Sequence, residues 1–313
     1  MTSPTRTWLL GMLGVVAAAG GCWRTSVFAI TGEAAIDGSG SDDGASPVIC
    51  PSPALKPGDT SQTIRVGSLN RSYVLHIPPS YDGNNPVPMV VDFHQGGDSG
   101  SSELSSSPYP AQTDPEGVIM VFPDGTKGPL NTPSWNIGPC CVAKVDDVAF
   151  ARALVKDVQT TACIDPSRIY AVGVGTGGGM AYYLACHAAD VFAAVASAAW
   201  DLLAENVDEC NPSRPITVLS FRGTADTVVP YAGGTSSVVP GMPITFLGAK
   251  TTFEKWAELD RCKGSPSQED SNECSAYSSC QDGVEVILCT QQGGHQGTGD
   301  ASVAWPVLKR YTL

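Results

Sequence analysis

The stretch Arg168–Ala185, RIYAVGVGTGGGMAYYLA, contains the features that decide the fold. It begins with a continuous apolar run typical of a buried strand, passes through a glycine-rich turn and continues as a helix led by small residues. Strand, sharp turn and helix in this order form a nucleophile elbow, whose Gly-x-Ser-x-Gly turn exposes a serine. The turn of this chain reads Gly173-Val174-Gly175-Thr176-Gly177, so a glycine stands at the serine position.

Apolar runs on both sides of this stretch predict a sheet. We expect eight strands, at Thr63 to Val66, Tyr73 to Ile77, Met89 to Phe93, Val118 to Phe122, Ile169 to Val174, Phe192 to Ala198, Ile216 to Phe221 and Val284 to Cys289. Helices are expected from Asp146 or Asp147 onward and at Thr176 to His187, Lys250 to Leu259 and Ser302 to Tyr311. Two hairpin-like strands followed by alternating strands and helices predict an α/β fold with a mostly parallel sheet flanked by helices.

Composition restricts the function classes. Of the 313 residues, 42% are hydrophobic and only 16% are charged, which indicates a globular chain with one large α/β domain. The net charge of −13 disfavours nucleic acid and anionic membranes as partners, because both require clustered lysine and arginine. We therefore expect a neutral or weakly charged substrate.

The first 60 residues are predicted to lie outside the folded domain. Residues 1–21 have the pattern of an export signal, because the apolar run from Trp8 to Ala19 is too short to span a bilayer and small residues lead to Cys22. This pattern resembles a bacterial lipobox. We expect a lipid on Cys22 to hold the protein at the outer membrane, outside the cytoplasm; a plain signal peptide cleaved nearby is the alternative. Residues 22–60 are predicted as a flexible linker and 61–313 as the folded domain.

Cysteine usage indicates an oxidising compartment. Eleven cysteines occur without a CxxC metal pattern, and ten remain once Cys22 is set aside, an even number that suits a disulfide-stapled fold. The sequence leaves the pairing open. We expect the adjacent Cys140 and Cys141 to bond to different partners, because neighbouring cysteines do not bridge easily. The four histidines do not lie at metal spacing, so no metal site and no cofactor are predicted.

Several further segments resemble one family of enzymes. The chain is similar to the secreted polyhydroxybutyrate-depolymerase-like and feruloyl-esterase-like proteins, which have the α/β-hydrolase fold, over most of residues 68–298. Besides the elbow, the similar segments are RSYVLHIPPSYDGNNPVPMVVDFHQGG, GVIMVFPDGT, PSWN, VDDVAFARALVKDV, CIDPSRIYAVG, FRGTADTVVPYAGG and EVILCTQQGGHQ, in the family's order.

The resemblance implies a set of site residues. Asp226 stands at the position of the triad acid and His295 at that of the base, and the order elbow, Asp, His is that of α/β hydrolases. As alternatives, Asp226 is only a turn former and His295 an exposed loop residue.

The oxyanion hole and the cleft are implied in the same way. Gln95, Gly96 and the backbone N–H of Thr176 are expected to form the oxyanion hole, with His94 shaping its loop beside the substrate. Trp135 and Asn136 are expected to line the substrate cleft; core packing of the tryptophan is the alternative.

The missing serine sets the functional question. Gly175 has no hydroxyl for His295 to deprotonate, so no acyl-enzyme can form there. Thr176 is the neighbouring hydroxyl, but an elbow presents one residue only. Gln95, where the family usually has Gly, and Arg222, where it usually has His, are further departures.

Three functional hypotheses remain. The first is an esterase-family protein that has lost hydrolysis and binds an ester-bearing small molecule or polymer, such as a polyhydroxyalkanoate or a feruloylated polysaccharide. The second is an active carboxylic ester hydrolase that uses Thr176 or a water activated by His295. The third is a surface-anchored scaffold or adhesion protein, which predicts neither ester turnover nor ester binding.

Overall fold

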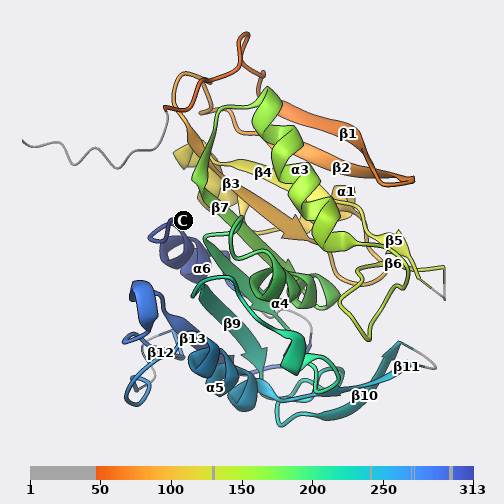
Figure 1. The fold of residues 1–313 in the computed structure, drawn as a ribbon, viewed down its shortest axis with the longest axis vertical. Coiled ribbons are helices and arrows are strands. Elements are labelled where there is room, and N and C mark those ends of the chain that lie inside the picture. Colours follow the sequence, from red (N-terminus) through yellow and green to blue (C-terminus); the bar gives the residue numbers. More distant parts are fainter. Residues whose placement is uncertain (1–46, 129–130, 240–241, 269, 271, 296–298) are drawn as a thin grey trace, which may run out of the picture. The chain divides into compact units, whose positions relative to one another are not determined.

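A nine-stranded sheet forms the centre of the domain (Figure 1). The computed structural model describes residues 47–128, 131–239, 242–268, 270, 272–295 and 299–313. The strands run across the sheet in the order β1-β2-β4-β3-β7-β8-β9-β13-β12. Their bounds are β1 (Gly58–Val66), β2 (Leu69–Ile77), β3 (Val87–Phe93), β4 (Ile119–Pro123), β7 (Ile164–Val174), β8 (Ala194–Ala198), β9 (Thr217–Gly223), β12 (Cys274–Tyr277) and β13 (Val286–Gln291).

The centre of the sheet is parallel and its edges are antiparallel. The pairs β4/β3, β3/β7, β7/β8, β8/β9 and β9/β13 are parallel, whereas β1/β2, β2/β4 and β12/β13 are antiparallel. Two short hairpins lie outside the sheet, formed by β5 (Thr126–Lys127) with β6 (Pro133–Ser134) and by β10 (Gly234–Val239) with β11 (Met242–Phe246). The predicted mostly parallel sheet is confirmed.

Helices cover both faces of the sheet, which explains why central strands such as β4 are buried along their whole length. The face seen in Figure 1 carries α3 (Asp147–Thr161), α4 (Thr176–His187) and α5 (Ala249–Leu259). The opposite face carries α1 (Gly100–Ser106), α2 (Pro110–Thr113) and α6 (Ala301–Leu308). The part of the chain that the structure describes also contains the 3-10 turns η1 (Asp114–Glu116), η2 (Val207–Glu209) and η3 (Gln281–Gly283). None of the described helices is long and apolar enough to cross a membrane.

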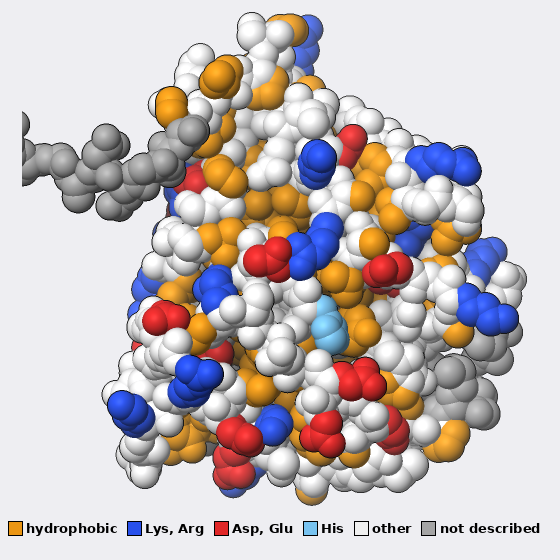
Figure 2. Space-filling view, in the orientation of Figure 1, with side chains coloured by type: hydrophobic (Ala, Val, Ile, Leu, Met, Phe, Trp, Pro, Cys, Tyr) orange, Lys and Arg blue, Asp and Glu red, His pale blue; other side chains and the backbone are white. Residues whose placement is uncertain are grey.

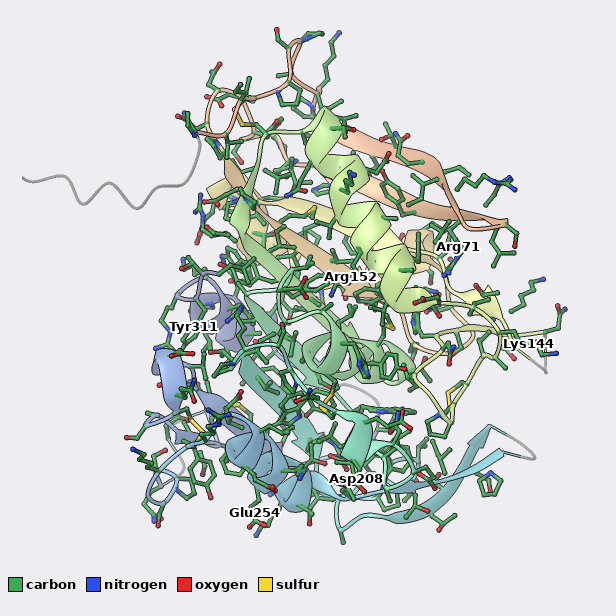
Figure 3. The ribbon with its side chains drawn as sticks, viewed as in Figure 1. Arg71, Lys144, Arg152, Asp208, Glu254 and Tyr311 are labelled. Carbon is green, nitrogen blue, oxygen red and sulfur yellow. A yellow bond between two sulfur atoms is a disulfide. The ribbon has the colours of Figure 1, made fainter. Side chains whose placement is uncertain are left out.

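The two aspartates expected to begin α3 have different roles. Asp146 caps the helix, because its side chain accepts a hydrogen bond from the Ala149 N–H at 2.8 Å. Asp147 is buried and forms an ion pair of 2.7 Å with Arg71 of β2. Arg152, further along the same helix, pairs with Asp190 at the surface; Figure 3 labels both arginines. Charged and apolar side chains are interspersed on the face shown in Figure 2.

The folded unit begins earlier than the sequence predicts. Pro47–Leu313 forms one compact unit, and Cys50, expected in the linker, is bonded to Cys163 at the start of β7. Residues 47–60 therefore belong to the domain. The predicted export signal, Cys22 and the linker up to residue 46 lie outside the described residues.

The observed disulfides contradict the prediction for Cys140 and Cys141 and give the pairing that the sequence leaves open. Cys140 and Cys141 bond to each other rather than to different partners, because a cis peptide bond between them brings their Cα atoms to 3.1 Å. The remaining bonds join residues 50 and 163, 186 and 210, 262 and 280, and 274 and 289.

Candidate active site

Gly175 lies in a sharp turn between β7 and α4. Its φ of 55° and ψ of −125° are backbone values that residues with a side chain rarely adopt. Its N–H donates to the Ala198 carbonyl of β8 at 2.9 Å. A Cβ on Gly173 or Gly177 would stand only 2.8 or 1.8 Å from the Phe93 carbonyl oxygen, so both positions require glycine. The turn is therefore the predicted elbow, packed closely against β3.

Asp226 and His295 meet beside this turn. Asp226 follows β9 and His295 follows β13, and these strands are parallel neighbours, so their carboxyl ends lie side by side. The His295 Nδ1 atom lies 2.9 Å from Asp226 Oδ2. The other carboxylate oxygen accepts the N–H groups of Val228 and Val229 at 2.8 and 2.9 Å. These bonds hold the Asp226 carboxylate in place. The His295 Nε2 atom lies 3.7 Å from the position that a Cβ on Gly175 would occupy.

A buried ion pair supports the acid loop. Arg222 and Asp201 form an ion pair in which neither side chain is exposed. Arg222 also donates to the Val229 carbonyl at 2.7 Å, and the N–H of Val229 in turn bonds to Asp226. Burial raises the pKa of Asp201 to about 6, although the Arg222 charge opposes this shift. The sequence identified Arg222 only as a departure from the family and gave no signal for Asp201.

The three predicted oxyanion residues surround the elbow. A Cβ on Gly175 would lie 3.4 Å from the Gln95 Cβ, and a Cβ on Gly96 would lie 3.5 Å from the Thr176 hydroxyl oxygen. The Thr176 side chain is buried, with its hydroxyl against Gly96. The segment PSWN gives no signal for a role of Ser134 at this site. The buried Ser134 hydroxyl lies 3.9 Å from the position of a Cβ on Gly96.

His94 organises the oxyanion loop from inside the protein. It is completely buried, with Nδ1 2.7 Å from the Gln95 carbonyl and Nε2 accepting the Gly125 N–H at 2.9 Å. Burial lowers the pKa of His94, and this favours the neutral ring that one donating and one accepting nitrogen require.

Trp135 and Asn136 also hold this loop. Trp135 is 0% exposed and donates from Nε1 to the His94 carbonyl at 2.9 Å, so the core-packing alternative describes it. The Asn136 side chain donates to the Val145 carbonyl at 2.6 Å. His94 and Trp135 are both buried, so neither side chain is accessible to a ligand in this structure, and their assignment to the substrate site stays a prediction.

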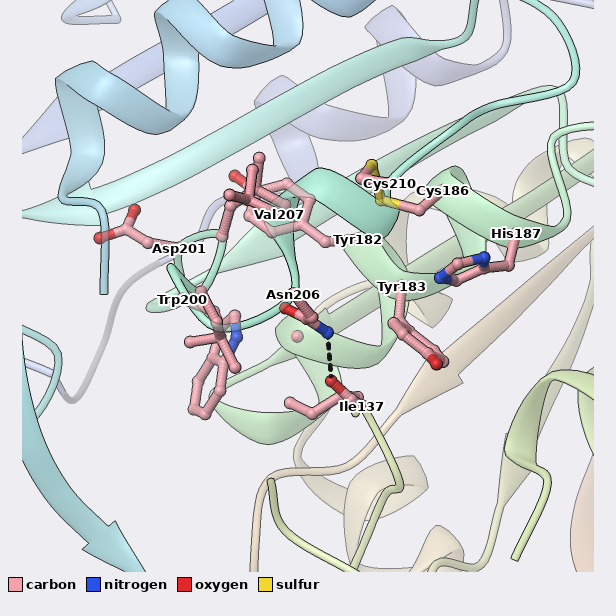
Figure 4. Close-up of a pocket in the computed structure, with 13 residues that line it drawn as sticks. Ile137, Tyr182, Tyr183, Cys186, His187, Trp200, Asp201, Asn206, Val207 and Cys210 are labelled. Atoms are coloured by element: carbon pink, nitrogen blue, oxygen red, sulfur yellow. Dashed lines mark hydrogen bonds between the residues drawn. A yellow bond between two sulfur atoms is a disulfide. The ribbon is translucent and has the colours of Figure 1, made fainter. Parts of the chain in front are cut away.

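A small hollow beside α4 has Asp201 in its wall but is not lined by Gly175, Asp226 or His295 (Figure 4). Its volume is about 20 Å³, enough for about one water molecule. Its lining includes Trp200, Asn206 and the disulfide between residues 186 and 210. Asn206 donates to the Ile137 carbonyl at 3.0 Å. This hollow is too small for an ester ligand.

Comparison with known families decides the assignment. The family described as "Esterase PHB depolymerase" matches residues 71–246, more than half of the chain. The chain belongs to the esterase PHB depolymerase family. The matched segment contains the elbow, Gln95, Gly96 and Asp226, and it ends before His295.

Individual relatives of this family member are feruloyl esterases. The chain is 43% identical over 246 residues to feruloyl esterase B of Piromyces equi, a match that covers 78% of this chain and 46% of that protein. It is 31% identical over 190 residues to feruloyl esterase C of Emericella nidulans, covering 58% of this chain and 66% of that protein. The chain thus spans about half to two thirds of the length of these relatives.

Solved structures confirm the predicted α/β-hydrolase fold. An acetyl xylan esterase from Aspergillus awamori superposes with a TM-score of 0.58 at 14% identity, covering 80% of this family member and 98% of the other chain. A thermostable esterase superposes with a TM-score of 0.52 at 13% identity, covering 82% and 63% of the two chains. At these identities the likeness shows the fold alone.

Proposed function

We propose that this member of the esterase PHB depolymerase family binds an ester in the inherited cleft without hydrolysing it through an acyl-enzyme. The observation that carries the proposal is Gly175, which occupies the nucleophile position of an elbow beside a hydrogen-bonded His295 and Asp226. Acyl transfer needs a hydroxyl or thiol at that position. Ester binding depends on other groups, so it can remain when bond cleavage is lost.

The ligand class follows from the relatives. Two proteins similar to this chain are named feruloyl esterases, and the family name refers to PHB depolymerase. We infer a feruloyl ester as the first ligand to test and a hydroxyalkanoate polyester as the second. The acidic chain supports an uncharged ester rather than an anionic ligand.

Binding and turnover are tested separately on the purified full chain. Ligand-observed NMR with methyl ferulate measures binding, and chromatography of the same samples measures released ferulic acid. We expect saturable binding without acid release. The variant Glu254→Gln, on the exposed face of α5 (Figure 3), serves as the matched control and is expected to behave like the native chain. Absence of binding to methyl ferulate and to a hydroxybutyrate oligomer would favour the scaffold hypothesis.

Slow hydrolysis by an activated water is the second candidate, and one observation favours it. The His295 Nε2 atom lies 3.7 Å from the position that a Cβ on Gly175 would occupy, so a water beside this turn would lie within reach of the imidazole. A water there can donate to the imidazole. Triads that lack a member retain roughly 10³ to 10⁴-fold acceleration over water. Loss of residual turnover in His295→Ala would support this candidate, and equal turnover in both chains would exclude it.

Export and lipid attachment at Cys22 complete the proposal. The five disulfides support a location in an oxidising compartment. Expression of the full chain in a bacterium that processes lipoproteins tests it. We expect the protein in the outer-membrane fraction and Cys22→Ala in the soluble extracytoplasmic fraction; recovery of both in the cytoplasm would contradict export.

A further inference from the structure

A cavity of about 160 Å³ lies behind the elbow, on the α1/α6 side of the sheet. It opens at the carboxyl ends of β3, β7 and β8. Gln95 and Val174, the neighbours of Gly175 in space and in sequence, form part of its wall. A ligand in this cavity would therefore lie next to the candidate active site without occupying the position of the serine.

The polar wall of the cavity is acidic. Asp92 of β3, Glu103 of α1 and Asp300 at the start of α6 line it together. Asp92 is 2% exposed and accepts a hydrogen bond from the Ser107 hydroxyl at 2.6 Å. Glu103 is 7% exposed and lines the cavity, and its carboxylate forms no hydrogen bond or ion pair with the described residues. A carboxylate that faces a cavity without a partner from the protein favours a cationic or donating group in that cavity.

No basic side chain of the described structure compensates these charges. The charges that act on Glu103 are those of Asp92 and Asp98, both negative. Burial raises the pKa of Glu103 and of Asp92, and their mutual repulsion raises that of Glu103 further. An entering cation would relieve this repulsion and replace the proton that the pair retains.

The rest of the wall combines the polar residues Gln95, Ser106 and Ser197 with apolar and aromatic side chains. Phe221, Tyr109 and Pro108 face the same space as the small residues Ala196 and Ala198. Aromatic rings attract cations over their faces, and alkyl groups favour apolar walls. Among the described residues no group of three or more His, Cys, Asp or Glu side chains is arranged to hold a metal ion. The combination fits an alkylammonium group better than a bare metal cation.

We propose that this cavity is a binding site for a small organic ammonium ion. Glu103 and Asp92 hold the ammonium group, and Phe221 and Tyr109 pack against its alkyl portion. The cavity adjoins the candidate active site through Gln95 and Val174, and binding of the ammonium ion does not depend on whether the chain hydrolyses esters.

The probe is n-butylammonium chloride, with 1-butanol as the neutral molecule of the same heavy-atom number. Both are titrated into the full chain at pH 7.5 and constant ionic strength, and binding is followed by ligand-observed NMR. We expect saturable binding of the ammonium ion at least tenfold tighter than that of butanol. Asp92→Asn and Glu103→Gln, which keep side-chain shape and remove charge, are each expected to weaken it at least tenfold.

Glu254→Gln removes an equal charge from the exposed surface of α5 and is expected to leave binding unchanged. Circular dichroism of each variant at the titration temperature verifies that it is folded. Three results would overturn the proposal: no saturable binding to the native chain, equal affinity for butanol, or unchanged affinity in both folded cavity variants.

Discussion

The Nε2 atom of His295 lies 3.7 Å from the position that a Cβ on Gly175 would occupy. A serine hydroxyl extends one bond beyond its Cβ, and a general base acts across about 2.6 to 3.2 Å. The other ring nitrogen is 2.9 Å from Asp226. The two side chains expected to be the acid and the base of a triad therefore lie beside a position that has no side chain.

The elbow conformation should make any side chain at position 175 costly. Because φ is 55° and ψ is −125° there, we expect Gly175→Ser and Gly175→Ala each to lower the free energy of unfolding by about 1–3 kcal/mol. Urea unfolding of the three chains measures this. The alanine variant separates backbone strain from any effect of the hydroxyl, and unchanged stability in both variants would mean that the turn is not strained.

Asp226 should act through His295. In the Gly175→Ser chain, Asp226→Asn removes the charge that orients the imidazole and stabilises its protonated form, so kcat for p-nitrophenyl acetate should fall about 10⁴-fold. Initial rates at pH 7.5 compare the Gly175→Ser chain with the chain that carries both Gly175→Ser and Asp226→Asn. A decrease of less than tenfold would be inconsistent with a triad role for this carboxylate.

The buried pair of Arg222 and Asp201 should be needed as a pair. Arg222→Met leaves a buried carboxylate without its partner and should lower the free energy of unfolding by about 3–5 kcal/mol. Replacing both residues, by Arg222→Met with Asp201→Leu, should be less destabilising than the single change. Urea titrations measure the free energy of unfolding of both variants. An equal or greater loss of this free energy in the double variant would refute the pairing argument.

Asp260 should make stability dependent on pH. Burial raises its pKa to about 7, although the Ile216 N–H donates to it at 3.0 Å, whereas an unfolded aspartate titrates near 3.9. Between about pH 4 and 7 the folded chain therefore binds the extra proton, and the stability gained from it is lost as the pH rises through 7.

Asp260→Asn should flatten this part of the stability profile. Urea unfolding at pH 5, 6, 7 and 8 measures the slope in both chains, with Glu254→Gln as the exposed control. An unchanged slope in the asparagine variant would show that Asp260 titrates normally.

The sequence predicted the elements that have a strong pattern of their own. All eight expected strands are present. Strands such as β4, β8 and β9 are buried along their whole length and have distinctive apolar runs, whereas β1 is largely exposed. The ninth strand, β12, has four residues, pairs only with β13 and is largely half-exposed, so no pattern marks it. Helix α1 lies within a serine-rich stretch, where Ser99 caps it by accepting from the Ser102 N–H at 3.3 Å.

Some residues of the candidate site could likewise be predicted from the sequence, and others could not. Asp226 and His295 could be predicted because their segments resemble the family's acid and histidine loops, and the order elbow, Asp, His agrees with that resemblance. The partnership of Arg222 with Asp201 and the bond between Cys140 and Cys141 depend on local three-dimensional proximity, which no spacing in the sequence encodes. Burial of Trp135 was likewise left open, because an aromatic residue suits both a core and a cleft.

The most direct test of the central claim is hydrolysis of methyl ferulate and p-nitrophenyl acetate by the native chain beside Gly175→Ser, with Gly175→Ala as the side-chain control. We predict that the native chain and the alanine variant are equally inert and that the serine variant turns over at least about 10³-fold faster. Native turnover equal to that of the serine variant would contradict the account, because Gly175 would then not be what prevents hydrolysis.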